Sequence, residues 1–160
     1  MFSRTSVRNL LISPSLVPNF SIKASFITGN TGSDTLLTVT SNLTGLPRVY
    51  IIEAYEGCDD LFINASVEAK ADGIVLSGMG AGAAAGQVQA EALRAAAKQG
   101  IVVVATTRTG AGLVVRNDRM KADGWVAGDN LNSYHARILL LLALTKTKDP
   151  EQIQRMFDTY

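Results

Sequence analysis

The chain has 160 residues, of which 47% are hydrophobic and 18% are charged. This length and composition predict one compact domain with a buried core and argue against a disordered chain. The formal net charge of +1 provides no overall field for attracting nucleic acid or an anionic membrane, so we expect neither as a partner. The only cysteine is Cys58 and the only histidine is His135, which excludes an internal disulfide and leaves no cluster of metal ligands. We therefore expect no metal and no cofactor.

The first 33 residues differ from the rest because they contain Arg and Lys but no Asp or Glu. We interpret residues 1–33 as a poorly ordered leader of unknown role, residues 34–48 as a linker-like segment and residues 49–160 as the folded domain. An Arg- and Ser-rich segment without acidic residues is typical of a mitochondrial transit peptide, but Pro14 and Pro18 interrupt the helix that such a peptide needs. The compartment stays open, with the cytoplasm favoured and the mitochondrion as the alternative.

From Leu46 onward, strand patterns alternate with helix patterns. Short β-branched or apolar runs predict strands at 48–54, 74–76, 101–105 and 125–127. Helix-forming segments follow at 61–70, 87–99, 133–145 and from Pro150 through Phe157. This alternation predicts an α/β fold with a small parallel sheet of about four strands, helices on both faces and right-handed crossovers. Such a three-layer arrangement is of the Rossmann or flavodoxin type.

Local signals mark where several of these helices begin and end. Asp59 and Asp60 precede the first helix, Asn132 precedes the third and Asp149 precedes the fourth, each able to accept a bond from an unpaired amide. Gly100 stands just after the second helix, where a left-handed residue commonly ends a helix. These residues predict the helix boundaries.

Two further expectations concern burial. The third helix is apolar on nearly all sides and too short to span a bilayer, so we expect a core helix with His135 in the core or in an interface. In the second helix we expect the buried side to consist of Val88, Ala92, Leu93 and Ala96.

Functional positions in parallel sheets lie at the carboxyl ends of the strands. In this chain those positions are the loops after Leu76 and Ala105. The second loop continues through residues 107–124, which are polar, contain several glycines and form an unusually long connection. We therefore expect this loop to be functional or to pack on a neighbouring chain.

A glycine-rich motif follows the second predicted strand. Gly78 to Ala83 fits the pattern G-x-G-x-x-A of dinucleotide-binding folds, in which helix amides face a pyrophosphate. The acidic residue expected about 20 positions later is missing, since that window holds Gln99, Gly100 and Ile101. A tight turn that lets the backbone pass close to a ligand or a neighbouring chain is therefore the favoured interpretation.

Residues for nucleophilic catalysis are not apparent. Ser77 lacks the preceding glycine of a G-x-S-x-G elbow, and Cys58 is far along the sequence from His135. The acidic residues Asp118, Asp123 and Asp129 lie in or just after the long loop, where solvation is the default role and ligand contact the alternative.

Several motifs taken together resemble one known family. They are Leu46-Pro47-Arg48-Val49, Gly73 to Gly82, Thr107-Arg108-Thr109-Gly110-Ala111-Gly112, and Leu131-Asn132 to Asp149-Pro150 with Ala136-Arg137-Ile138-Leu139-Leu140 between them. In order and spacing, these motifs look like the carboxy-terminal domain of the bacterial-type (type II) L-asparaginases. The resemblance covers residues 34–160, and within it residues 34–45 look like the linker between the two domains of that family.

The resemblance implies a role that depends on assembly. In that family the nucleophilic threonine, a second threonine with its aspartate, and the activating lysine belong to an amino-terminal domain that these residues do not include. The carboxy-terminal domain lends substrate-binding residues to a neighbouring subunit. Those positions correspond here to Gly82 and Ala83 in the glycine loop and to Asn117 or Asp118 in the later loop. At Ala83 the family commonly has Ser or Asn, which can hydrogen-bond where a methyl group cannot.

Three functions remain as hypotheses. The first is a fragment of an L-asparaginase, which converts L-asparagine to L-aspartate and ammonia. This fragment would bind substrate only when assembled with a catalytic domain, as a homo-oligomer or a mixed assembly, and would be inactive alone. The second is a non-catalytic interaction module that assembles with a full-length asparaginase, which Ala83 favours. The third is nucleotide binding by the glycine loop. Whether the chain is an enzyme by itself is left open.

Overall fold

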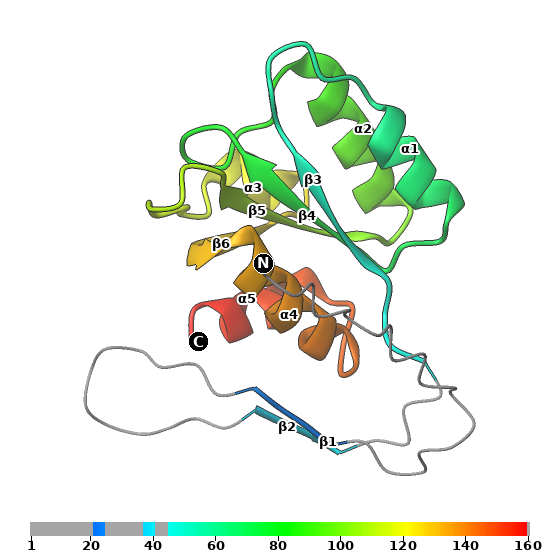
Figure 1. Cartoon of the computed structure of the whole chain (residues 1–160), viewed down its shortest axis with the longest axis vertical. Coiled ribbons are helices and arrows are strands. Elements are labelled where there is room, and N and C mark those ends of the chain that lie inside the picture. The colour runs from blue at the N-terminus through cyan, green and yellow to red at the C-terminus, as the bar shows by residue number, and fades with distance from the viewer. Residues whose placement is uncertain (1–20, 25–36, 41–44, 160) are drawn as a thin grey trace, which may run out of the picture.

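The computed structural model describes residues 21–24, 37–40 and 45–159. Within them are two sheets, a two-stranded antiparallel pair and a four-stranded parallel sheet (Figure 1). The antiparallel pair joins β1 (Ser21–Ala24) to β2 (Leu37–Thr40). Most of the predicted leader and much of the linker-like segment lie outside the described residues, so their expected disorder and role stay predictions.

The larger sheet has the strand order β3-β4-β5-β6, and every neighbouring pair is parallel. Its strands are β3 (Val49–Glu53), β4 (Gly73–Gly78), β5 (Val102–Thr107) and β6 (Val126–Asn132). The predicted four-stranded parallel α/β fold is confirmed. The last strand extends beyond residues 125–127 because its pairing with β5 shifts register between Ala105 and Thr107 and then continues to Asn132.

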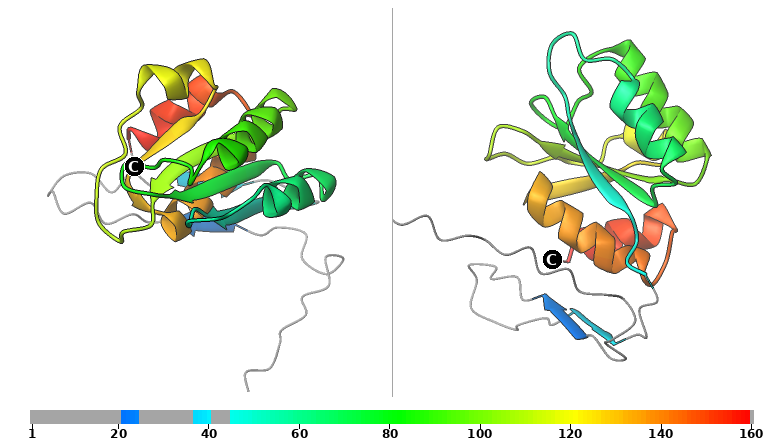
Figure 2. Two further views of the ribbon diagram at one scale, coloured as in Figure 1. Left: turned by 90° about the horizontal axis from the view of Figure 1, so that it is seen from above. Right: turned by 45° about the vertical axis from the view of Figure 1, so that its right-hand side comes forward.

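Five helices accompany this sheet in the described part of the chain. They are α1 (Leu61–Glu68), α2 (Gln87–Lys98), α3 (Asp118–Ala122), α4 (Ser133–Leu144) and α5 (Pro150–Phe157). Helices α1 and α2 cover one face of the sheet, and α4 and α5 cover the other (Figures 1 and 2). The short helix α3 lies inside the segment that the sequence analysis treats as a loop.

The side chains of the central strands alternate between two hydrophobic clusters. In β5, Val102 and Val104 pack into the cluster under α4 and α5, whereas Val103 and Ala105 pack into the cluster under α1 and α2. Every residue of β4 and β5 is buried. A parallel strand covered on both faces needs apolar residues at successive positions, which explains the continuous β-branched runs in the sequence.

The predicted helix ends are largely as expected. The side chain of Asn132 accepts the amide of His135 at 2.9 Å, and that of Asp149 accepts the amide of Glu151 at 3.0 Å. Gly100 has a φ of +86°, as a glycine after a helix requires. Before α1, Asp59 accepts the amide of Leu61 at 3.1 Å, whereas Asp60 forms no side-chain cap.

One burial prediction is wrong, and another is reduced to one of its two alternatives. Val88 is 56% exposed, because the buried stripe of α2 runs through Gln89, Leu93 and Ala96. The amide of Gln89 can be buried because it accepts the amide of Ala85 and donates to the carbonyl of Glu53. His135 is exposed on α4, which rules out the core and leaves an interface as its expected role.

The glycine motif forms a closed turn at the carboxyl end of β4. Met79 and Ala83 exchange two backbone hydrogen bonds, of 2.8 and 2.9 Å, and Gly82 has a φ of +84°. A Cβ atom on Gly78 would stand 2.5 Å from the backbone carbon of Gly82, so the turn leaves no room for a side chain there. Helix α2 begins only at Gln87, after this turn has closed. The motif therefore acts as a close-approach turn, not as the direct start of a helix.

Replacing Gly78 by Ala should reduce the free energy of unfolding by about 1–3 kcal/mol, because the added methyl group collides with backbone that cannot rotate away. Gly45→Ala is the matched control, since nothing lies within 4 Å of its added Cβ atom. Urea denaturation of both variants measures the difference. Equal stabilities of the two would contradict the proposed steric constraint.

Asp72, just before β4, makes polar contacts with two other segments at the amino-terminal ends of the strands. Its carboxylate accepts the amide of Arg48 at 2.9 Å and forms an ion pair with Lys148 at 2.8 Å. The hydrogen bond from Lys148, followed by that from Arg48, lowers the pKa of Asp72 from its ordinary value of 3.8. Asp72 thereby links the start of β3 to the connection between α4 and α5.

The lowered pKa makes the contribution of the Asp72 carboxylate to the free energy of unfolding pH-dependent. It is fully present above pH 3.8 and is lost as the pH falls through the lower pKa of the folded state. Asp72→Asn should therefore reduce the unfolding free energy at neutral pH by about 0.5–1 kcal/mol, a small effect because the pair is partly exposed. Urea denaturation across the acid range should show this loss shrinking at low pH. Lys148→Gln should give a similar loss, and a fully additive double variant would argue against the pair.

Candidate functional site

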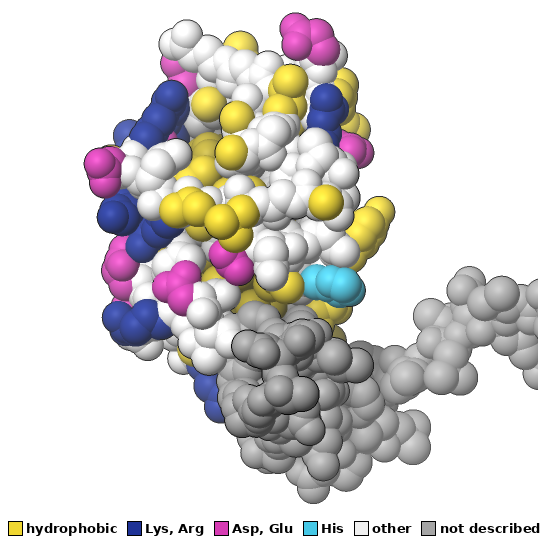
Figure 3. Space-filling model, turned by 90° about the vertical axis from the view of Figure 1, so that its left-hand side faces the viewer, with side chains coloured by type: hydrophobic (Ala, Val, Ile, Leu, Met, Phe, Trp, Pro, Cys, Tyr) yellow, Lys and Arg dark blue, Asp and Glu magenta, His cyan; other side chains and the backbone are white. Residues whose placement is uncertain are grey.

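The loops after β4 and β5 pack directly against each other. A Cβ atom on Gly82 would lie 2.9 Å from Cγ1 of Val114, so the contact requires glycine. Val114 is 1% exposed, and its amide donates to the carbonyl of Asp129 at 2.9 Å. These contacts hold the two loops and the middle of β6 as one unit at the carboxyl edge of the sheet. Figure 3 shows the face that carries these loops, with apolar side chains near its middle and charged side chains along one side.

An open cavity of 640 Å³ lies between the glycine turn, α2 and α3. Its lining residues are Ala81, Gly82, Ala83, Ala84, Gly86, Gln87, Ala90, Arg94, Asn117, Arg119, Met120, Asp123 and Trp125. This volume is within the usual range of small-molecule sites. The cavity is therefore the strongest candidate site in the described part of the chain.

Three of the four residues singled out from the sequence line this cavity. Gly82 and Ala83 contribute the wall after β4, and Asn117 contributes the wall after β5. Asp118 is not in the lining; its side chain is fully exposed, with Oδ1 at 3.8 Å from Nζ of Lys121. The structure thus brings the two predicted loops together and separates the neighbours Asn117 and Asp118.

Asn117 also has a local structural role. It is the N-cap of α3, and its Oδ1 accepts the amide of Met120 at 2.9 Å. Met120 is buried in the cluster under α1 and α2. The short helix is therefore held by the cap at its first turn and by the packing of the Met120 side chain. The side-chain Nδ2 of Asn117 makes no hydrogen bond to other described residues and remains available to a ligand.

The cavity wall also contains residues that the sequence analysis did not assign to a site. Arg94 on α2 forms an ion pair with Asp123 through Nε and Oδ2 at 2.8 Å, with side chains only 24% and 19% exposed. Trp125 forms another part of the wall and is 6% exposed. No local pattern marks these residues, because they meet only when α2 packs beside α3.

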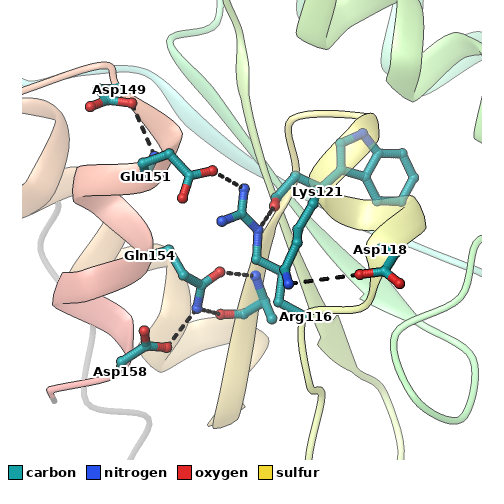
Figure 4. A network of polar contacts seen from close by, with 9 residues as sticks. Arg116, Asp118, Lys121, Asp149, Glu151, Gln154 and Asp158 are labelled. Atoms are coloured by element: carbon teal, nitrogen blue, oxygen red, sulfur yellow. Dashed lines mark hydrogen bonds and ion pairs between the residues drawn. The ribbon is translucent and has the colours of Figure 1, made fainter.

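A polar network holds both ends of the α3 segment in place (Figure 4). Arg116 donates to the carbonyl of Trp125 at 2.8 Å and pairs with Glu151 on α5 at 2.7 Å. Its hydrogen bond lowers the pKa of Glu151. Gln154 bonds both backbone groups of Ala127, accepting at 2.8 Å and donating at 3.2 Å. Through these contacts α5 positions the chain on both sides of the cavity wall.

The lining offers hydrogen-bond donors and charge but no hydroxyl, thiol or imidazole group. None of the lining residues is a Ser, Thr, Cys or His. Among the described residues there is no cluster of three or more His, Cys, Asp or Glu that could hold a metal ion. The same part of the chain contains no helix with the length and apolar character needed to cross a membrane.

The cap of α3 can be tested directly. Asn117→Ala should reduce the unfolding free energy by about 1 kcal/mol because the amide of Met120 loses its acceptor. Asn117→Asp should keep most of the stability, since a carboxylate caps equally well and favours a helix N-terminus. Thermal and urea denaturation of the two variants provide the measurement. Equal losses for Ala and Asp would show that the side-chain bond contributes little.

Comparison with known proteins gives one consistent result. The family model of the glutaminase/asparaginase C-terminal domain matches residues 48–157. L-asparaginase 2 of Bacillus subtilis is 42% identical over 120 residues, which are 75% of this chain and 32% of the relative. L-asparaginase 2 of Escherichia coli is 42% identical over 130 residues, 80% of this chain and 37% of the relative. A glutaminase-asparaginase of Pseudomonas fluorescens is 36% identical over 121 residues, 74% of this chain and 33% of the relative.

The matched region begins at the start of β3 and includes the whole parallel sheet with α1 to α5. The chain spans about a third of the length of the curated relatives it matches. Its parallel sheet, glycine turn and paired loops are thus those of one recognised domain, and the chain belongs to the glutaminase/asparaginase C-terminal domain family.

Proposed function

We propose that this chain is the substrate-completing C-terminal part of an L-asparaginase, an amidohydrolase that converts L-asparagine to L-aspartate and ammonia. The observation that carries the proposal is the position of Ala83 and Asn117 on the wall of one open cavity at the carboxyl edge of the sheet. These residues come from separate loops, yet the packing of Gly82 on Val114 holds both loops together. The names of the matched relatives, L-asparaginase and glutaminase-asparaginase, support this substrate class.

Catalysis in this proposal requires another domain. Hydrolysis of an amide through a covalent step needs an activated nucleophile, and the cavity lining contains no hydroxyl, thiol or imidazole. The chain alone should therefore bind and orient substrate groups without cleaving them. It would contribute to activity by completing the site of a neighbouring subunit.

The two loops would contribute unequally to substrate binding. Asn117 can offer its free Nδ2, whereas Ala83 presents only a methyl group. Asp118 points to solvent and could meet a substrate ammonium group only on the outer side of α3. Because Ala83 cannot form a hydrogen bond, substrate binding should be weaker here than in proteins that have a hydroxyl or amide at this position.

Exposed apolar side chains support assembly with other chains, as a homo-oligomer or as a mixed assembly. Tyr50, Tyr55, Leu61 and Phe62 are 40–61% exposed around β3 and α1. On α4, Tyr134 is 74% and Ile138 is 41% exposed, and His135 lies beside them. Apolar area of this kind on a small domain is typical of an interaction surface.

Ala83 also supports a second candidate function. A chain that has the domain but lacks a hydrogen-bonding group at this position could be a non-catalytic module that assembles with a full-length asparaginase. Both candidates involve association, but they differ in its effect. A substrate-completing part raises the activity of its partner, whereas a module changes assembly without raising activity.

The decisive experiment mixes the purified chain with the amino-terminal part of Bacillus subtilis L-asparaginase 2. The chain alone should show no asparagine hydrolysis, and the mixture should co-elute and show activity. Ala83→Ser should then lower KM on the order of tenfold, because one restored hydrogen bond to a charged group is worth roughly 1.5–3 kcal/mol. Asp118→Asn should raise KM if its carboxylate meets the ammonium group of the substrate.

Glu68→Gln is the matched control, because it removes an exposed carboxylate on α1, away from the cavity lining. Steady-state kinetics on each mixture provide the measurement. If Ala83→Ser and Asp118→Asn both behave like Glu68→Gln, the assignment of these two positions is wrong. Co-elution without any gain in activity would favour the non-catalytic module.

A further inference from the structure

The two edges of the parallel sheet differ in how far the chain covers them. β6 forms one edge and β3 forms the other. Along β6, both backbone groups of Ala127 are bonded by the side chain of Gln154. Two residues further, the carbonyl of Asp129 accepts the amide of Val114 at 2.9 Å. An uncovered strand edge is a template for pairing with another chain, and at β6 the chain's own groups occupy it.

The free edge of β3 is identified by the direction of its backbone bonds. The carbonyl of Arg48 accepts the amide of Gly73 at 3.1 Å, and the amide of Ala54 donates to the carbonyl of Ser77 at 2.9 Å. Successive residues of a strand point their backbone groups to opposite sides, so the even-numbered residues 48–54 bond to β4. The odd-numbered residues 49, 51 and 53 therefore face away from the sheet.

The chain covers this edge only at its two ends. The carbonyl of Val49 accepts Nε of Arg137 on α4 at 2.9 Å. The carbonyl of Glu53 accepts Nε2 of Gln89 on α2 at 3.3 Å. Between them, neither backbone group of Ile51 has a hydrogen-bond partner among the described residues. The middle of the β3 edge is thus open to an added strand.

Apolar side chains flank this open edge. A groove of 470 Å³ lies between β3 and α1, and its walls include Tyr50, Tyr55 and Phe62, which are 40%, 43% and 59% exposed. On the other face of the sheet, α4 brings Arg137 to the same edge, and Tyr134, one turn earlier in α4, is 74% exposed. Figure 1 shows α1 and α4 on the two sides of β3. Apolar area of this kind is typical of an interaction surface.

A second copy of this chain fits the open edge by symmetry. In an antiparallel pair of β3 strands centred on Ile51, each Ile51 donates its amide to the carbonyl of Ile51 in the other copy. The two-fold axis also places Val49 of each copy opposite Glu53 of the other. The carbonyls of Val49 and Glu53 can accept these further amides, because a carbonyl oxygen has two lone pairs.

The charges beside the two strands complement each other in this register. Val49 and Ile51 pack into the cluster under α4 and α5, so Glu53 points to the same face by alternation. Glu53 is exposed and Arg137 is half-buried, and neither forms an ion pair in the part of the chain that the structure describes. Glu53 of one copy would lie opposite Val49 of the other, whose carbonyl holds Arg137. Opposite charges thus meet at both ends of the contact.

We propose that two copies of this chain associate through antiparallel pairing of their β3 strands about Ile51, which joins two four-stranded sheets into one continuous sheet. Such a contact uses the same surface on both copies, so it closes as a dimer and does not extend into a fibre. The cavity assigned to the substrate includes no residue of β3 or α1. The dimer is therefore independent of the proposed asparaginase role.

Hydrogen exchange of the full chain tests the pairing at one atom. The Ile51 amide should exchange rapidly in dilute solution, whereas the Ile52 amide, which bonds to β4, stays protected. As the concentration rises and sedimentation shows dimers, exchange at Ile51 should slow in proportion to the dimer fraction. A dimer with unchanged exchange at Ile51 would overturn the proposal. So would a chain that stays monomeric up to about 1 mM, where even a weak dimer is populated.

Variants test the register by sedimentation. Glu53→Arg replaces attraction to Arg137 of the second copy by repulsion at both ends, and should weaken the dimer about tenfold. Glu91→Arg is the matched control, because it makes the same charge change at an exposed position of α2, which packs on β5 and not on the edge strand. Equal dimer affinities of these two variants would contradict the proposed register.

A third variant removes the central hydrogen bonds. Ile51→Pro deletes the one amide in the middle of β3 that faces away from β4, and proline is tolerated on edge strands at such positions. The dimer should be lost, while urea denaturation shows that the monomer still folds. A folded Ile51→Pro chain that dimerises as the unmodified chain does would show that the contact lies elsewhere.

The same amide reports on a different occupant of the edge. If the chain is monomeric alone and Ile51 becomes protected only when the amino-terminal part of Bacillus subtilis L-asparaginase 2 is added, that part covers β3 and the proposed self-pairing is wrong. These measurements involve no activity, so their failure leaves the proposed asparaginase role untouched. Absence of activity in the mixing experiment, in turn, leaves the β3 dimer untouched.

Discussion

The four strands of the larger sheet run parallel and lie side by side in chain order, and most other features of the molecule depend on this constraint. Each crossover between parallel strands is right-handed as a rule, so helices that connect strands in consecutive order lie on the same face. This accounts for α1 and α2 on one side of the sheet. The other face must be covered by chain that follows the last strand, and α4 contacts all four strands there.

The same constraint places the functional loops together. Parallel strands end at one edge, so the chain after β4 and the chain after β5 emerge next to each other. Proximity alone would leave two independent loops. The contact of Gly82 with Val114, the bond from Val114 to Asp129 and the bridge made by Arg116 convert them into one surface. A surface built on rigid strands presents its side chains without reorganising.

The cavity between the glycine turn, α2 and α3 is lined by polar, charged and apolar side chains. Its lining includes the side-chain amide of Asn117 and the guanidinium of Arg119 but no hydroxyl, thiol or imidazole group. A strand order without reversal also lacks the crevice at which open α/β sheets hold dinucleotides, and the glycine motif closes on itself before α2 begins. The structure therefore gives no support to nucleotide binding at that motif. The proposed completion of a neighbouring subunit's site is compatible with this lining.

The amino-acid sequence by itself determined the strands, the longer helices, several helix caps and the family, because these depend on local periodicity and on motifs of fixed spacing. Val102 to Val104 read as a doubly covered strand, and Asn132 and Asp149 read as caps, for reasons within a few residues of each position. The loops carrying Ala83 and Asn117 were identified by resemblance. Only the tertiary structure decided which of Asn117 and Asp118 lines the cavity, since neighbours in a helix point in different directions.

The tertiary structure also decided which residues gather around the cavity. Helix α3 has five residues, too few to show a period, and it exists because Asn117 caps it and Met120 is buried beneath α2. Val88 is exposed because the neighbouring Gln89 takes the buried position, where its side chain hydrogen-bonds to the backbone of Ala85 and Glu53. The unpartnered indole of Trp125 has no signature in sequence, because a missing hydrogen bond is a property of everything that surrounds the atom. Local sequence patterns specified the helices and strands, whereas packing between distant segments specified which residues surround the cavity.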